Sequence, residues 1–348
     1  MPTDHQAWAW TPNAGLDGLQ LLRKPLPQPG PGEVLVANRA IALNPVDWKI
    51  CEWGHPAWQQ GTVPGVDGAG VVVAVGAGVD LPLGSRVAYH QSLARDGSFA
   101  QHCLLDASLV MHIPSALGDT AAAAVPCPAL TAWQALAKVP EGASRDVLVI
   151  GAGGAVGFYL AQLAAQRGLR VWASAGRRHH ATLKALGVSG VFDYHDADWQ
   201  NQLQAALGER PLHALFDTVS SAHAGSLAHL LGYNGHLVCI QDRQETAPTP
   251  AFGTAISLHE VALNSIHAHG QLADRQALRV AGERLWAGRR RWQPDRATTP
   301  RVRFLGIAPG SAAVERGPRR RQMGDAPRLN ALCENLDPIL LQGMLGNS

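Results

Sequence analysis

Four glycines within seven residues, Gly151 to Gly157, separate an apolar run from a helical pattern in VLVIGAGGAVGFYLAQLAAQRG (147–168). A G-x-G-G-x-x-G turn at this place excludes side chains, because the chain turns tightly and a pyrophosphate must approach the backbone. The following helix N-terminus offers N–H groups and a positive dipole to phosphates. The turn predicts a dinucleotide site rather than a merely structural turn. Its residues are Gly151, Gly153, Gly154, Ala155, Val156 and Gly157.

From about Val125, short apolar strands alternate with helical segments: DVLVIG, RVWASA, VFDY, ALFDTV and GHLVCI mark the strands. This alternation predicts an α/β fold with a doubly wound parallel sheet, and places a nucleotide site at its switch point. Up to about Ala124 the chain is instead β-rich, with short runs bounded by Pro and Gly as in a compact partial barrel. We therefore expect domains at 1–124 and 125–260, followed by a return helix over 261–288.

The composition supports two globular domains, since the 348 residues are 46% hydrophobic and only 16% charged. Five cysteines without a C-x-x-C pair argue against a disulfide framework and a structural zinc lobe. The opening MPTDHQAWAW lacks a basic region followed by an apolar core, so we expect a cytoplasmic protein. The stretch 147–166 is apolar enough to resemble a membrane span, but its glycines favour a strand, turn and helix.

The end of the second strand indicates the cofactor. In an NAD site this strand, RVWASAG (170–176), would end in an acid that binds the ribose 2′-hydroxyl, and none is present. Ser174 lies near that position, and Arg177 and Arg178 follow, which suits a 2′-phosphate. The alternative is that these arginines only solvate the start of a helix. The pattern favours NADPH.

Six motifs in order resemble the medium-chain dehydrogenase/reductase superfamily, in its zinc-free quinone-oxidoreductase (zeta-crystallin-like) branch. The resemblance runs from near the N-terminus to about Gly288. The motifs are ALNPVDWKI (42–50), VPGVDGAGVV (63–72), DGSFAQH (96–102), AAAVPCPALTAWQAL (122–136), GAGGAVG (151–157) and FDTVSS (216–221). The resemblance implies a GroES-like catalytic domain, a Rossmann domain and an active cleft between them.

The resemblance also locates the family's zinc ligands. Zinc-binding members use a Cys three residues before an Asp, where this chain has Asn44, and a Gly-His-Glu, where it has Gly-Val-Asp ending at Asp67. The third ligand position is matched by Cys127, four residues before Thr131. One thiolate without partners cannot build a three-ligand catalytic site. We expect no metal.

Without a metal to polarise a carbonyl, the substrate must already be electrophilic, such as a quinone or an α,β-unsaturated carbonyl. The resemblance assigns Asn44, Asp47 and Lys49 to the substrate side, with Asn44 donating to the developing oxygen. We assign no general acid. His55, Trp53 and Trp58 either shape a pocket for a flat substrate or only cover the cleft rim. The implied cofactor positions are Thr131, the glycine turn, Ser174, Arg177, Tyr194, Asp217 and Val219.

Other functions stay open at this point: an alcohol or aldehyde reductase, a non-catalytic NADPH-binding protein, or a nucleic-acid binder. The last would act through residues 289–321, where ten arginines stand against two acids, so that this segment carries +8 and the rest of the chain −6. No aromatic platform is interleaved with these arginines. We expect a small-molecule substrate, no nucleic-acid or membrane partner, and a homodimer as one assembly to be tested.

The arginine-rich segment has a genetic explanation. Residues 320–325 can be encoded CGG CGG CAA ATG GGT GAT, and dropping the first base reads Gly-Gly-Lys-Trp-Val, which resembles the family's closing strand. We therefore hypothesise that residues 289–348 are an aberrant, out-of-frame tail and that a sheet edge is left exposed. Resequencing the codons for residues 285–296 tests this, and a read without a one-base slip contradicts it.

Overall fold

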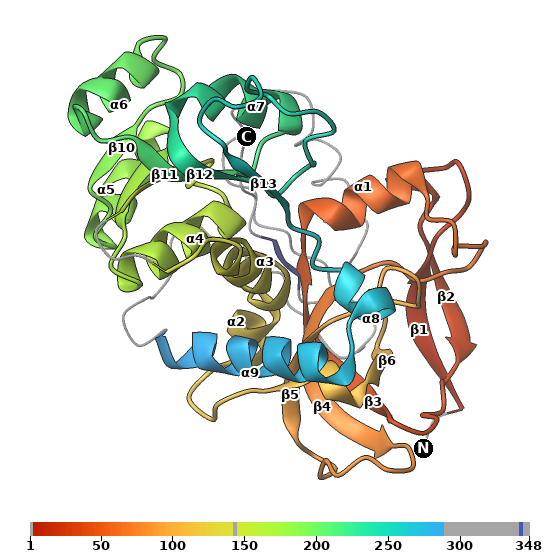
Figure 1. Cartoon of the computed structure of the whole chain (residues 1–348). Helices are drawn as coiled ribbons and strands as arrows, with labels where there is room; N and C mark the ends of the chain where they lie inside the picture. Colours follow the sequence, from red (N-terminus) through yellow and green to blue (C-terminus); the bar gives the residue numbers. More distant parts are fainter. Residues whose placement is uncertain (1–2, 142–144, 289–340, 344–348) are drawn as a thin grey trace. The chain divides into compact units, whose positions relative to one another are not determined.

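The strand–helix alternation after Val125 builds a parallel sheet of six strands within the described residues, in the order β10-β9-β8-β11-β12-β13. The computed structural model describes residues 3–141, 145–288 and 341–343, and divides into two compact units (Figure 1). The second unit, Pro128–Ser265, holds this sheet. Its strands are β8 (Asp146–Ile150), β9 (Arg170–Ser174), β10 (Gly190–Phe192), β11 (Leu212–Asp217), β12 (Leu231–Cys239) and β13 (Ser257–Glu260).

Helices cover both faces of this sheet, and central strands such as β8, with the sequence DVLVI, are therefore buried along their whole length. Figure 1 shows α4 and α5 on one face and α6 and α7 on the other. On the second side, Leu148 and Leu215 of the sheet pack with Leu203 and Leu227 in one core. The helices are α3 (Pro126–Ala137), α4 (Ala155–Gln166), α5 (His180–Ala185), α6 (Trp199–Leu207) and α7 (Ser221–Leu227).

The strand order confirms the expected doubly wound topology. The chain moves outward from β8 through β9 to β10, then crosses back to β11 on the other side of β8. The carboxyl ends of β8 and β11 therefore flank the switch point, where ligands bind in open α/β sheets. The glycine turn follows β8 at this place.

One strand of the sheet was not expected from the sequence. β13, with the sequence SLHE, pairs in parallel with β12 and forms the sheet edge. Three of its four residues are exposed, so the strand lacks the apolar run that marks its buried neighbours. Its extended backbone is specified by hydrogen bonds to β12 rather than by its own residues.

The first unit contains the described residues of Met1–Cys127 and Ile266–Leu345. Its main sheet has the antiparallel core β3-β4-β5-β7, with β6 paired to β3, and a separate hairpin joins β1 to β2. The β-rich pattern expected up to about Ala124 is thus confirmed. The elements are β1 (Asp4–Ala9), β2 (Gln20–Pro25), β3 (Glu33–Leu43), α1 (Pro45–Trp53), β4 (Asp67–Val75), β5 (Arg86–His90), β6 (His102–Asp106), β7 (Met111–His112) and α2 (Asp119–Ala123).

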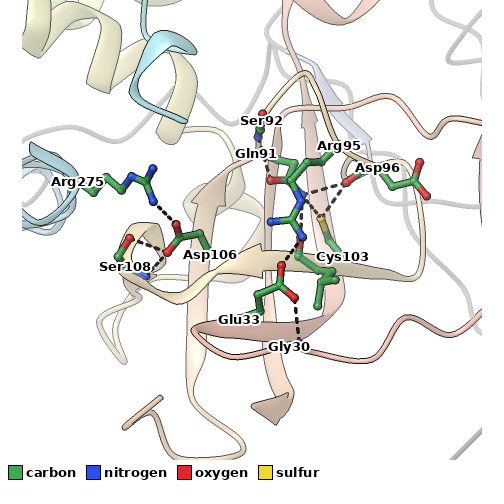
Figure 2. Close-up of polar contacts among 11 residues, drawn as sticks. Gly30, Glu33, Gln91, Ser92, Arg95, Asp96, Cys103, Asp106, Ser108 and Arg275 are labelled. Carbon is green, nitrogen blue, oxygen red and sulfur yellow. Dashed lines mark hydrogen bonds and ion pairs between the residues drawn. The ribbon is translucent and has the colours of Figure 1, made fainter. Parts of the chain in front are cut away.

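The chain returns to the first unit through α8 (Ser265–His269) and α9 (Leu272–Gly288). The Arg275 guanidinium of α9 forms an ion pair with the Asp106 carboxylate at the end of β6 (Figure 2), at a distance of 2.6 Å. Glu283 accepts the backbone N–H of His112. Nearby, Glu33 joins Arg95 (2.6 Å) to the Gly30 backbone. The contacts of Arg275 and Glu283 therefore fasten the return helix to the β-rich part of the first unit.

The hypothesised out-of-frame segment lies outside the described residues, apart from a short strand. This strand, β14 (Leu341–Gly343), pairs in parallel with residues 41–43 of β3. The expectation that this sheet edge is left exposed is therefore wrong, because backbone pairing needs no particular side chains. In the part of the chain that the structure describes, no helix has the length and apolarity to cross a membrane.

Candidate active site

The glycine turn between β8 and α4 is closed so tightly that side chains do not fit. Gly151 has a φ of +72°, and a Cβ on it would lie 2.2 Å from the Thr218 Oγ1. A Cβ on Gly157 would lie 2.4 Å from the backbone oxygen of Gly151. Gly154 caps α4, so the first-turn N–H groups, including those of Ala155 and Val156, lie next to this turn. The turn thus has the cradle that a dinucleotide phosphate requires.

Ser174, expected at the adenosine end, lies beneath the turn. Its side chain is 1% exposed, and its Oγ accepts the Gly151 N–H at 3.3 Å. Its backbone oxygen accepts the N–H of Ala152 at 2.9 Å. Ser174 therefore holds the glycine turn against the end of β9.

The other side of the switch point is shaped by Asp217, at the end of β11. Its buried carboxylate accepts the N–H groups of Val219 (2.6 Å) and Ser220 (3.0 Å), and it lies 2.5 Å from Nδ1 of His223. This contact raises the pKa of His223 above its usual value. Asp217 therefore fixes the loop, while Val219 is half exposed on it.

A polar cluster lies at the ends of β9 and β10, beyond Ser174. Arg177 donates from Nε to Asp193 at 2.9 Å, and the Asp193 carboxylate also contacts Nδ1 of His195 at 2.9 Å. The Tyr194 and His195 rings lie 4.2 Å apart between centroids. The sequence analysis named Arg177 and Tyr194 as cofactor candidates but did not name Asp193. Strand pairing places Asp193 next to this site, because the preceding residue, Phe192, is the register partner of Ser174.

Thr131, the remaining cofactor candidate, is buried on α3 of the second unit. The structure thus brings the glycine turn, Ser174, Asp217 and Val219 to one edge of the sheet. Arg177 and Tyr194 gather at the end of the neighbouring strands.

The first unit contains a second cluster, around the positions that the resemblance assigns to zinc ligands; Asn44 and Cys127 stand at two of them, and Asp67 follows the third, Val66. The Asn44 Nδ2 donates to the Asp67 carboxylate at 3.1 Å, and the backbone N–H of Cys127 donates to both Asp67 oxygens at 3.1 and 2.9 Å. Asn44 is 7% exposed and Asp67 is fully buried. Burial, with a smaller contribution from the nearby Asp47 charge, raises the pKa of Asp67 well above its usual value.

These residues do not fit a catalytic zinc ion. The Asn44 amide nitrogen faces the Asp67 carboxylate as a donor, and Val66, in place of the histidine, offers no ligand atom. Within the described residues, no group of three His, Cys, Asp or Glu side chains is arranged to hold a metal. Hydrogen bonds to Asp67, the residue after Val66, thus connect Asn44 and Cys127, which stand at two of the three implied ligand positions.

Asp47 supports Asn44 from the first turn of α1. Its Oδ2 accepts the Asn44 N–H at 2.6 Å and its Oδ1 accepts the Val66 N–H at 3.1 Å. The carboxyl is 1% exposed, and burial raises its pKa to about 7, although these two hydrogen bonds lower it. Asp47 therefore joins the helix start to the segment that carries Asp67.

Lys49, the third residue assigned to the substrate side, lies further along α1. It lies two residues after Asp47 on α1, and therefore on a different side of that helix. Its Nζ lies 5.8 Å from the Trp48 ring and 5.9 Å from the Trp53 ring.

The aromatic residues after α1 differ in their surroundings. Trp58 donates from its indole to the Leu93 backbone oxygen at 2.6 Å and packs edge-on against Trp10, whereas Trp53 is 71% exposed. His55 accepts the Ala57 N–H within its own turn. Trp58 is thus a packing residue of the first unit.

Comparisons with known proteins match both units of the fold. The alcohol dehydrogenase GroES-like domain matches residues 30–115, and the zinc-binding dehydrogenase model matches residues 155–279. The chain is 34% identical over 217 residues to the trans-enoyl reductase tazE of Aspergillus terreus, covering 57% of this chain and 71% of that protein. It is 35% identical over 199 residues to the chloroplast envelope quinone oxidoreductase homolog of Arabidopsis thaliana, covering 52% and 58%.

A solved structure of an alcohol dehydrogenase superfamily protein from Novosphingobium aromaticivorans is similar with a TM-score of 0.71 and 27% identity, covering 82% of this chain and 87% of that one. The matched regions span 58% to 71% of the length of the first curated relatives. With its GroES-like sheet and its Rossmann sheet, the chain belongs to the medium-chain dehydrogenase/reductase superfamily, in the quinone-oxidoreductase-like branch.

Proposed function

We propose that this protein is a zinc-independent, NADPH-dependent oxidoreductase that transfers hydride to quinones or to α,β-unsaturated carbonyls. The observation that carries the proposal is the Asn44–Asp67–Cys127 hydrogen-bond network, which joins two of the three positions that the resemblance assigns to zinc ligands. The names of relatives, a trans-enoyl reductase and a quinone oxidoreductase homolog, support the same substrate classes.

The second unit supports a nicotinamide dinucleotide as cofactor. The glycine turn leaves no room for a Cβ at Gly151 or Gly157, and a phosphate fits such an open backbone beside a helix N-terminus. The absence of an acid at the end of β9 and the exposed Arg177 favour a 2′-phosphate, and hence NADPH. When bound, this cofactor supplies the hydride.

The first unit supports activation of an electrophilic substrate by hydrogen bonding. The Asn44 amide has two N–H donors, and Asp67 takes one of them. The second can donate to the oxygen on which charge develops, with Asp47 and Asp67 holding the amide in place. A quinone or an enone needs no more polarisation than this, whereas a simple carbonyl ordinarily gains from a metal. The proton is taken from solvent.

The test is a titration of the full chain with NADPH and NADH by fluorescence, followed by NADPH oxidation with quinones, enones and simple aldehydes. We expect tighter binding of NADPH, turnover with quinones or enones, and no loss of rate with a metal chelator. Reduction of simple aldehydes at equal rates would favour the alcohol or aldehyde reductase instead. Binding without turnover would favour a non-catalytic NADPH-binding protein.

A substitution of Asn44 tests the substrate side separately. Asn44→Ser keeps a residue that caps α1 but removes the side-chain N–H donor. We expect kcat to fall about 100-fold while the Kd for NADPH stays unchanged, a loss typical for removal of one oxyanion donor. An unchanged kcat in a folded Asn44→Ser variant would contradict a role for this amide in the reaction.

A further inference from the structure

The Arg177 side chain is held by one edge only. Its contact with Asp193 uses Nε, at 2.9 Å from Oδ2, and the side chain is otherwise 82% exposed. Within the described residues, its two Nη groups make no hydrogen bond with the protein. A guanidinium held through Nε presents the Nη groups as a planar fork, the arrangement that binds phosphate oxygens through two parallel hydrogen bonds.

Asp193 is itself fixed, so it can act as an anchor. Its side chain is only 13% exposed, and its Oδ1 accepts the backbone N–H of His195 (3.1 Å) and contacts the Nδ1 of the same residue. These hydrogen bonds, together with that from Arg177, hold the pKa of Asp193 below its usual value. The carboxylate is therefore ionised at neutral pH and kept in one orientation.

The backbone brings this pair to the end of the second strand. Phe192 is the register partner of Ser174, and its oxygen accepts the Ala175 N–H at 2.9 Å, which places Asp193 beside the start of the Arg177 segment. A Cβ on Gly176 would lie 3.8 Å from the Tyr194 hydroxyl, so this ring lines the same stretch of backbone. The second strand end is where the adenosine ribose of a dinucleotide is read.

The neighbouring charged groups have other partners. Arg178 donates from Nε to Nε2 of His179 at 2.8 Å, and that ring lies against Gly153 of the glycine turn. Asp196 accepts the Asp198 backbone N–H at 3.0 Å and the Gln202 amide at 2.9 Å. Among these groups, Arg177 with Asp193 has the geometry of an oriented phosphate fork.

We propose that Asp193 is a positioning residue that orients Arg177 toward the 2′-phosphate of NADPH, so that discrimination against NADH depends on the carboxylate that follows β10. This inference rests on the proposed NADPH function and deepens it. Two other roles for Asp193 give different results: a charge that only opposes Arg177, and an acceptor for the ribose hydroxyls. In the first role the Asp193 carboxylate weakens binding of the 2′-phosphate in the wild type, and in the second role it favours binding of NADH.

The experiment measures the Kd of NADPH and NADH by fluorescence titration for the wild type and for Asp193→Ala, Asp193→Asn and Arg177→Ala. Asp196→Ala is the matched control, because it removes one nearby negative charge without touching the Arg177 Nε. Melting temperatures and circular dichroism verify that each variant is folded. The fragments 2′,5′-ADP and 5′-AMP repeat the comparison without the nicotinamide half.

We expect Asp193→Ala to weaken NADPH binding about fivefold, because binding must then order a rotamer-rich arginine side chain. Asp193→Asn keeps an oxygen acceptor for Nε and should restore binding to within about twofold, while Arg177→Ala should weaken it about tenfold or more. The Kd for NADH and for 5′-AMP should stay unchanged. In the Arg177→Ala background, Asp193→Ala should have no further effect.

Tighter NADPH binding in Asp193→Ala would overturn the proposal and assign Asp193 as a charge that only opposes Arg177. Weakening of NADH binding beyond that of NADPH would overturn it in favour of a ribose acceptor, and equal weakening of both would overturn it in favour of a purely structural role. An equal loss of NADPH affinity in Asp196→Ala would mean that the effect of Asp193→Ala comes from the change in net charge alone, which would also overturn the proposal. If the wild type binds neither nucleotide, the proposed function fails as well, whereas normal NADPH preference with unaffected Asp193 variants contradicts only this inference.

Discussion

Asp47→Asn tests whether the buried carboxyl beside Asn44 is protonated in the folded protein. Burial raises its pKa from 3.8 to about 7, so below pH 7 the folded state holds a proton that the unfolded state releases above pH 4. The stability of the wild type should therefore fall as pH rises from about 4 to about 7 and level off above that. At 1.36 kcal/mol per pKa unit, the whole fall amounts to about 4 kcal/mol.

The variant should lose this dependence at a structural cost. The carboxyl oxygens accept the Asn44 and Val66 N–H groups, whereas an asparagine offers one oxygen acceptor and one NH₂ donor. One N–H therefore loses its acceptor, at a cost of about 1–3 kcal/mol. Asp47→Asn should be the less stable protein at pH 5, and the difference should shrink by about 3 kcal/mol by pH 8.

The assay is urea unfolding of the full-length protein, followed by tryptophan fluorescence at half-unit steps from pH 5 to pH 8. Asp80→Asn, which removes an exposed carboxylate from the same unit, is the matched control. Asp67 has a raised pKa for the same reason and contributes a slope of the same sign, which remains in the Asp47 variant. A difference between wild type and Asp47→Asn that stays constant within about 0.5 kcal/mol across this range would refute the reasoning.

Four further substitutions test the second unit. Gly157→Ala should lower the melting temperature and abolish NADPH binding, because its Cβ would lie 2.4 Å from the Gly151 backbone oxygen. A Cβ on Gly154 would lie 3.4 Å from the same oxygen, an ordinary contact distance, so Gly154→Ala should remain folded and lose only NADPH binding. His223→Ala should be destabilised most below pH 6.5, with the deficit disappearing as pH rises through the raised pKa of His223; a pH-independent deficit in urea unfolding would rule out the ion pair with Asp217. Leu215→Ala should lower the free energy of unfolding by about 2–5 kcal/mol, since its side chain is fully buried in the sheet core. A loss below about 1 kcal/mol would mean that the core relaxes around the cavity.

The sequence predicted those parts of the protein whose signals are local. Buried parallel strands are continuous apolar runs, so DVLVI and ALFD could be recognised without knowledge of their neighbours. The glycine turn is likewise a local signal, since the steric reason for each glycine lies in the conformation of the turn itself. The alternation of these elements was enough to predict the doubly wound sheet and its switch point.

Tertiary structure decided which side chains meet. The β13 edge strand has no apolar pattern and exists through its pairing with β12. The sequence could place Ser174 at a strand end, but not show that its hydroxyl is occupied by the Gly151 N–H. The partners of these hydrogen bonds are distant in the chain: Asp67 and Cys127 are 60 residues apart, and Arg177 and Asp193 are 16 residues apart. Such partners are selected by strand order and register, which depend on the packing of the whole unit and leave no trace in the spacing of either residue.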